Sequence, residues 1–212
     1  MTSVNPDIQL NHTPGHVKHD GHNMTGFVIF LLSESVIFLA FFAGYAVLKL
    51  TAPQWLPDGV EGLEVRMPLI NSVVLVSSSF VAYFAERYLH KGNLWGFRAV
   101  WFLTMAMGSY FVYGQYVEWS ELTFSLSSGV FGGMFYLLTG FHGLHVITGI
   151  LLMGLMLARS FRPGNYDKGE MGVASVSLFW HFVDVIWILL FLLIYVWPVS
   201  YTHLTLPTIC SV

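Results

Sequence analysis

The stretch Thr139-Gly-Phe-His-Gly-Leu-His-Val-Ile-Thr148 lies inside an apolar segment that runs from Phe131 to Ala158. This segment exceeds the roughly 20 apolar residues that a helix needs to cross a bilayer. His142 and His145 therefore lie near the middle of a predicted membrane-spanning helix. Hydrocarbon does not accept an imidazole without a hydrogen-bonding partner, and ionisable groups at this depth are usually functional. The rest of the chain must supply partners for both histidines.

The composition of the whole chain is that of a membrane protein. Of its 212 residues, 55% are hydrophobic and only 10% are charged, and the mean hydropathy is +0.65. Soluble domains carry about 25% charged residues. Long apolar runs recur without the alternation of barrel strands, so we predict an all-α polytopic membrane protein, a bundle of five transmembrane helices. The expected spans are Gly26–Leu50, Pro68–Leu89, Ala99–Trp119, Phe131–Ala158 and Met171–Trp197.

The positions of the cations predict the orientation, because cytoplasmic loops of membrane proteins are rich in Lys and Arg. Seven of the nine Lys and Arg residues precede the first span or flank the second and fourth connections. We therefore place the N-terminus in the cytoplasm and the C-terminus outside. No basic surface suited to nucleic acid is visible. The seven cations are Lys18, Arg87, Lys91, Arg98, Arg159, Arg162 and Lys168.

Two terminal segments lie outside the predicted domain, which covers residues 26–197. Residues 1–25 are polar and we expect a disordered leader, although their histidines could bind a metal. Residues 198–212 form a tail with no role that the sequence explains, and an artefactual origin is one interpretation. This tail holds Cys210, the single cysteine, which excludes an internal disulfide or a cysteine-ligated metal. The leader's histidines are His12, His16, His19 and His22.

Ionisable residues recur at a similar depth in three of the predicted spans. Glu34 lies about 12 Å from the cytoplasmic end of the first span, and His181 and Asp184 lie about 15 and 20 Å into the fifth. His145 and His142, which share one face of the fourth span, are about 20 and 24 Å along it. We therefore predict one buried polar layer that joins three helices through acid–imidazole pairs.

Two interpretations of Glu34 are open, because hydrocarbon disfavours its charged form. It is either a hydrogen-bonding contact to a neighbouring helix or a protonatable site that communicates with a proton route. For the serines of Ser77-Ser78-Ser79 in the second span, we expect packing and local hydrogen bonds. For Gln115 and Glu118, toward the outer end of the third span, we expect a solvated role.

Three functions for the polar layer are compatible with these residues. His142 and His145 would permit a metal site, and His142 with His181 would permit a bis-imidazole haem. A proton-conducting channel or transporter is the second, although the sequence shows no broken helix, inverted repeat or cationic gate. The third, favoured by elimination, is a structural and lipid-binding subunit with one or two protonatable groups.

Three motifs together resemble subunit III of the haem–copper respiratory oxidases. They are Leu32-Ser-Glu-Ser-Val-Ile-Phe38, Thr139-Gly-Phe-His-Gly-Leu-His-Val146 and Trp180-His-Phe-Val-Asp-Val-Ile-Trp187, in the family's order and on separate helices. Ser127-Ser-Gly-Val-Phe-Gly-Gly133 matches as well. The similarity covers Met24 to Trp197 and is closest to the bacterial cytochrome c oxidase subunit III, with the quinol oxidase subunit III as the alternative.

The resemblance implies a non-catalytic subunit without haem, copper or any other metal. Haem and copper are then expected in partner subunits, with oxygen reduced to water in subunit I and with subunit II in the same complex. Subunit III of this family binds phospholipid, supports proton uptake and stabilises the catalytic subunit. The resemblance also implies that Glu34 is the family's carbodiimide-reactive glutamate and that Arg159 contacts a lipid headgroup. A cation at the cytoplasmic end of a helix is well placed for such a contact.

The chain departs from the longer members of this family, which have two further helices before the one that holds Glu34. The lipid cleft that those helices bound is incomplete in a five-helix form unless a partner supplies the missing wall. By the same resemblance, His142, His145, His181 and Asp184 are expected to join helices. The expected location is the bacterial cell membrane or another energy-transducing membrane.

Overall fold

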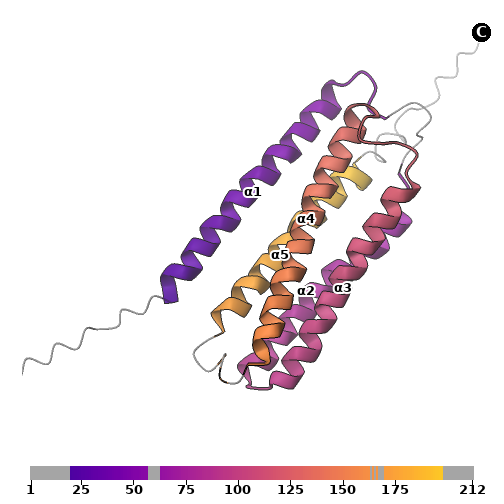
Figure 1. Cartoon of the computed structure of the whole chain (residues 1–212). Coiled ribbons are helices and arrows are strands. Elements are labelled where there is room, and N and C mark those ends of the chain that lie inside the picture. The colour runs from indigo at the N-terminus through magenta and orange to yellow at the C-terminus, as the bar shows by residue number, and fades with distance from the viewer. Residues whose placement is uncertain (1–19, 57–62, 163, 165, 167–169, 198–212) are drawn as a thin grey trace, which may run out of the picture.

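The computed structural model describes residues 20–56, 63–162, 164, 166 and 170–197, and these residues form five α-helices without any β-strand. The prediction of an all-α fold with five helices is confirmed, and the helices pack as an elongated bundle (Figure 1). The helices are α1 (Asp20–Thr51), α2 (Arg66–His90), α3 (Leu94–Glu121), α4 (Gly129–Ser160) and α5 (Met171–Phe191), which continues as the π-helical turn η1 (Leu192–Val196).

Four of these helices are long and apolar enough to cross a membrane, namely α1 from Met24, α2, α4, and α5 together with η1. The chain is therefore a membrane protein. Helix α3 is as long as the others but less apolar, because it carries Gln115, Glu118 and several Trp and Tyr residues. Trp and Tyr are typical of membrane interfaces. A crossing by α3 stays a prediction.

Helix α1 begins at Asp20, six residues before the expected span. Helix propagation adds one backbone hydrogen bond per residue, and no proline interrupts residues 20–25, so the helix extends beyond the apolar run. The last residues of the predicted leader are thus helical. The described residues do not include His12, His16, His19, the side chain of His22 or the tail at 198–212.

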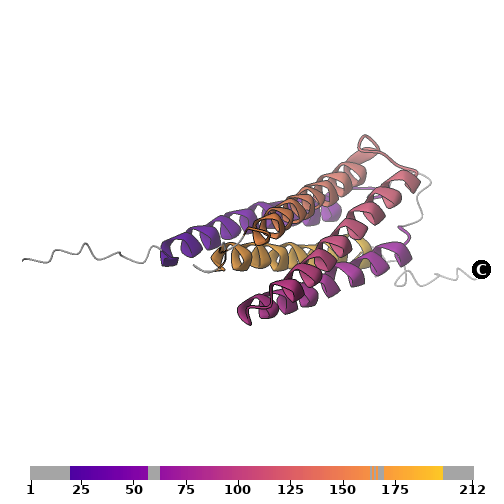
Figure 2. The ribbon, with the colours of Figure 1, turned by 60° about the horizontal axis from the view of Figure 1, so that its bottom comes forward.

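Helix α5 lies at the centre of the bundle and packs against α1, α2 and α4. Helices α2 and α3 form an antiparallel hairpin, in which Gly92 adopts a positive φ of 72° and Asn93 caps α3 through the amide of Gly96. Figure 2 shows this pair on one side of α5 and α1 on the other. Helix α1 packs mainly on α4 and α5, so much of its apolar surface is exposed.

Trp180 fixes the position of α5 against three other helices. Its indole is fully buried and passes between Gly108 of α3 and Gly149 of α4. A methyl group at either glycine would come closer than 3.0 Å to the ring. The indole nitrogen also donates to Ser78 Oγ of α2 at 2.8 Å. The close approach of the helices around α5 therefore depends on these two glycines.

Candidate functional site

Glu34 and His145 connect α1 to α4 through a direct side-chain contact. Nε2 of His145 lies 3.2 Å from Oε2 of Glu34, and the two side chains are 13% and 18% exposed, in the order His145, Glu34. Nδ1 of His145 lies 2.8 Å from the carbonyl oxygen of Phe141, so it must carry a proton and donate to it. Nε2 then either accepts a proton from a neutral Glu34 or, in the imidazolium, donates to the carboxylate. In both cases one hydrogen bond joins α1 to α4.

Aromatic rings enclose this pair on both sides. Phe38 of α1 packs edge-on against His145 with ring centroids 5.1 Å apart, and Phe141 does so at 4.8 Å. Phe179 of α5 stacks on the same imidazole at 6.2 Å. Apolar walls of this kind exclude water and strengthen the electrostatic interaction between the two groups. The contact is thus a half-buried polar link within an aromatic interface.

His142 turns away from His145 and toward α5. It is fully buried, and its Nε2 donates to the carbonyl oxygen of Val183 at 3.2 Å. Its ring packs on Trp187 at 4.9 Å and meets the edge of Phe111 of α3 at 5.8 Å. Nδ1 of His142 has no hydrogen-bond partner among the described residues. This histidine therefore joins α4 to the backbone of α5.

His181 and Asp184 of α5 both contact Ser79 of α2. The Ser79 hydroxyl donates to Oδ2 of Asp184, while Nδ1 of His181 lies 2.9 Å from Ser79 Oγ. Since the hydroxyl proton goes to the carboxylate, Nδ1 of His181 must donate to the serine oxygen. Asp184 is buried, and its Oδ1 is unpaired in the described part of the chain. One serine thus links an acid and an imidazole that the sequence predicts as a pair.

The structure therefore brings the five predicted polar residues into separate contacts. Glu34 meets His145 directly, His181 and Asp184 meet through Ser79, and His142 binds a backbone carbonyl. Within the described ranges, no side-chain hydrogen bond joins these three contacts to one another. Each contact does connect two different helices, and together they involve α1, α2, α4 and α5.

The serines of α2 accept hydrogen bonds from the tryptophans of α5, which the sequence-based expectation of local bonding did not include. Ser78 accepts from Trp180 and Ser72 accepts from the indole of Trp187, both at 2.8 Å. The accepting serines, Ser72 and Ser78, are six residues apart, whereas Trp180 and Trp187 are seven apart. Since the two intervals differ, the spacing in the sequence gives no signal for these two pairs.

Arg159 lies exposed at the end of α4, near the segment between α4 and α5. In that segment the Tyr166 hydroxyl donates to the carbonyl oxygen of Met156 at 2.6 Å. Burial raises the pKa of Tyr166, and the positive charges of Arg159 and Arg98 oppose the rise. Arg98 itself binds Ser160 through its hydroxyl and its carbonyl oxygen. The arginines therefore cluster where α3 begins and α4 ends.

Gln115 and Glu118, which the sequence predicts to be solvated, are bonded to other side chains in the structure. Gln115 is 7% exposed and donates to Oε2 of Glu118 at 2.9 Å. Oε1 of Glu118 accepts from the Tyr195 hydroxyl at 2.5 Å. Tyr195 belongs to η1, and π-helical turns re-aim side chains and are frequent at functional sites. The expectation is wrong for Gln115 because Tyr195 and Glu118 cover it.

No group of three or more His, Cys, Asp and Glu residues forms a metal-binding arrangement in the described ranges. The polar side chains between the helices are instead engaged with one another, with serines or with the backbone. An arrangement of this kind can hold helices together and can hold a proton at the contact of Glu34 with His145.

Comparisons with known proteins agree with the motifs. The model of the family "Cytochrome c oxidase subunit III" matches residues 4–199 of the chain. This chain belongs to the cytochrome c oxidase subunit III family.

Relatives of this subunit III chain come from distant organisms. It is 41% identical to the cytochrome c oxidase subunit 3 of Synechocystis sp. over 92% of the chain and 85% of the relative. Identity to the subunit of Thermostichus vulcanus is 43%, over 84% of the chain and 89% of the relative. Identity to the subunit of Dugong dugon is 35%, over 90% of the chain and 74% of the relative. The motifs around Glu34, His145 and Asp184 lie within the residues that the family model matches.

Proposed function

We propose that this subunit III chain is a cofactor-free accessory subunit of a proton-pumping cytochrome c oxidase that reduces oxygen to water. Haem and copper then belong to subunits I and II, and this chain stabilises the catalytic subunit beside which it packs. The observation that carries the proposal is that the polar groups between the helices serve as contacts: the buried His142 and the half-buried Glu34 and His145 each contact a neighbouring helix. The relatives are named as cytochrome c oxidase subunits, which supports an oxidase complex as the assembly in which this bundle works.

Five membrane crossings with a cytoplasmic N-terminus are part of this proposal, with the bacterial cell membrane as the location. Among the described residues, one end of the bundle carries most of the cations, and this end holds the start of α1 and α3 and the end of α2 and α4. The positive-inside tendency supports a cytoplasmic location for that end. The cations there are Arg87, Lys91, Arg98, Arg159 and Arg162.

The positions of Arg159 and Glu34 support the proposed roles in phospholipid binding and in proton uptake. Arg159 is exposed at the cationic end of α4, where a guanidinium suits a phospholipid headgroup. Glu34 contacts His145 at the edge of the bundle, since α1 packs mainly on α4 and α5, and a carboxyl group beside an imidazole suits the proposed support of proton uptake. The exposed apolar side of α1 supports the expectation that a partner subunit or bound phospholipid covers it.

Copurification tests the proposal. An affinity tag on this chain in its native host should bring down subunits that carry haem and copper, and the complex should oxidise reduced cytochrome c. The chain purified alone should show no Soret absorption band. A Soret band from the isolated chain, or proton flux through it in liposomes, would contradict the accessory role. Oxidation of quinol in place of cytochrome c would assign the subunit to a quinol oxidase.

A further inference from the structure

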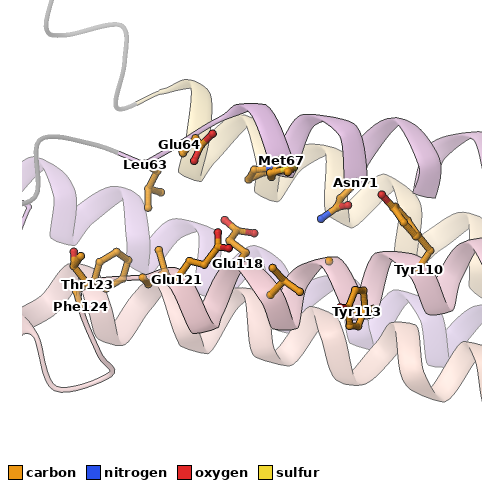
Figure 3. Close-up of a pocket in the computed structure, with 14 residues that line it drawn as sticks. Leu63, Glu64, Met67, Asn71, Tyr110, Tyr113, Glu118, Glu121, Thr123 and Phe124 are labelled. Carbon is orange, nitrogen blue, oxygen red and sulfur yellow. The ribbon is translucent and has the colours of Figure 1, made fainter.

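A pocket opens between α2 and α3 at the end of the bundle opposite Arg98 and Arg159. Its volume is about 370 Å³, and it extends from the segment before α2 down to Asn71 on α2 and Tyr110 on α3. Figure 3 shows acidic side chains around its outer part and the amide of Asn71 directed into it from the inner part. The volume is that of a small-ligand site.

Asn71 is a buried polar group without a partner in the described part of the chain. Its side chain is 6% exposed and makes no hydrogen bond to any residue that the structure describes. The amide lies against the backbone of Gly114, where a methyl group would overlap it. The amide faces the pocket, so a ligand there can supply the hydrogen bonds that the described chain does not.

Three carboxylates surround the approach to Asn71. Glu118 is held in place by Tyr195 and Gln115, so its oxygens face the pocket at a fixed position. Glu64 and Glu121 are exposed near the mouth and have no hydrogen bond or ion pair within the described part of the chain. The described residues that line the pocket include no cation, and Arg66 is exposed between Glu64 and Met67. Three carboxylates outnumber this one arginine, so the charge around the pocket favours a positively charged ligand.

We infer that this pocket binds a primary ammonium group carried on a short alkyl chain. An ammonium has three N–H donors, which suit the Glu118 carboxylate and the amide oxygen of Asn71. The alkyl chain fits the apolar walls formed by Met67 and Val117. The carboxylates do not form a three-ligand metal group in the described structure, which favours an organic cation over a directly coordinated metal ion.

Equilibrium dialysis of the purified oxidase complex with labelled n-butylamine tests the site. We expect saturable binding that n-butanol and tetramethylammonium do not compete for, because neither carries a charged N–H donor. Asn71→Leu and Glu118→Gln should each weaken binding about tenfold, the effect of losing a hydrogen bond to a charged group. Glu121→Gln at the exposed mouth should weaken it less, and it tests the site without disturbing buried contacts.

The matched control is Glu86→Gln, which removes an acid from the opposite end of α2 and should leave binding unchanged. Equal competition by n-butanol would overturn the inference, as would butylamine binding that survives both Asn71→Leu and Glu118→Gln. Displacement by an ethanolamine phospholipid but not by a choline phospholipid identifies the lipid headgroup as the natural source of the ammonium. Displacement by neither phospholipid identifies a free amine. The readout is ligand binding, so its failure leaves the proposed oxidase role untouched.

Discussion

The indole nitrogen of Trp180 donates to Ser78 Oγ at 2.8 Å, and this bond joins the central helix α5 to α2. The same ring lies between Gly108 and Gly149, so that α2, α3 and α4 meet around one tryptophan. The bundle therefore depends on two different properties of this side chain, its hydrogen-bond donor and its flat shape.

Gly108→Ala and Gly149→Ala are expected to destabilise the bundle. Each added methyl would overlap the Trp180 ring, and overpacking of this kind typically costs about 1–3 kcal/mol. Thermal unfolding of the detergent-solubilised complex measures the change. Gly143→Ala is the matched control, because no described atom lies within 4 Å of the position that its new methyl group would take, and it should be neutral. Equal stability of all three variants would show that the helices do not depend on close approach at Trp180.

Ser79→Ala is expected to weaken the contact between α2 and α5. The change removes the hydroxyl shared by His181 and Asp184 and leaves both groups without it, at a cost of about 1–3 kcal/mol. Ser77→Ala is the control, since the Ser77 hydroxyl bonds to the carbonyl of Val73 in its own helix. The unfolding midpoints of the two variants should differ. Identical midpoints would mean that the hydroxyl of Ser79 does not hold α2 and α5 together.

Four of the described helices are predictable from sequence because each contains a long apolar run, and α3 is marked by a less apolar run rich in Trp and Tyr. Which helix each side chain contacts is less predictable. A spacing of three residues places two side chains on one broad face of a helix but does not say which helix packs against that face. His142 and His145 are about 60° apart around α4, and this is enough to direct one toward α5 and the other toward α1.

The serines of α2 show a second reason for the missed contacts. Local bonds were the expectation for this serine run, and the Ser78 hydroxyl does donate to the carbonyl of Leu75 in its own helix. A hydroxyl can also accept, so Ser78 receives the indole of Trp180 at the same time. The two functions are compatible, and the residue type alone does not reveal the second.

Glu34→Gln should leave the subunit assembled while removing a reactive carboxyl group. Since Nδ1 of His145 donates to Phe141, its Nε2 can accept from the amide of Gln at position 34, and the link to α1 persists. Slow carbodiimide labelling of the wild-type chain near neutral pH should disappear in this variant. Peptide mass spectrometry locates the label. Unchanged labelling would place the reactive acid elsewhere, with the half-buried Glu118 as the first candidate.

Tyr166→Phe should remove part of the loss of stability at alkaline pH. Burial raises the pKa of Tyr166 above its ordinary value of 10.0, so the folded state holds this proton more tightly than the unfolded state does. Its contribution is therefore complete below pH 10 and is lost as the pH rises through the folded-state pKa. Unfolding midpoints measured from neutral to alkaline pH should fall less steeply in the variant. Parallel curves would show that the hydroxyl does not contribute.

A double-mutant cycle on Glu34 and His145 tests most directly the claim that polar contacts between helices hold this subunit together. Glu34→Ala, His145→Ala and the double variant are compared with wild type by unfolding of the purified complex. Polar contacts in membrane bundles show coupling of about 0.6 kcal/mol on average and up to about 1.7. We predict coupling in this range, because the two groups are 3.2 Å apart and enclosed by aromatic rings. Additive effects, with coupling below about 0.3 kcal/mol, would contradict the account.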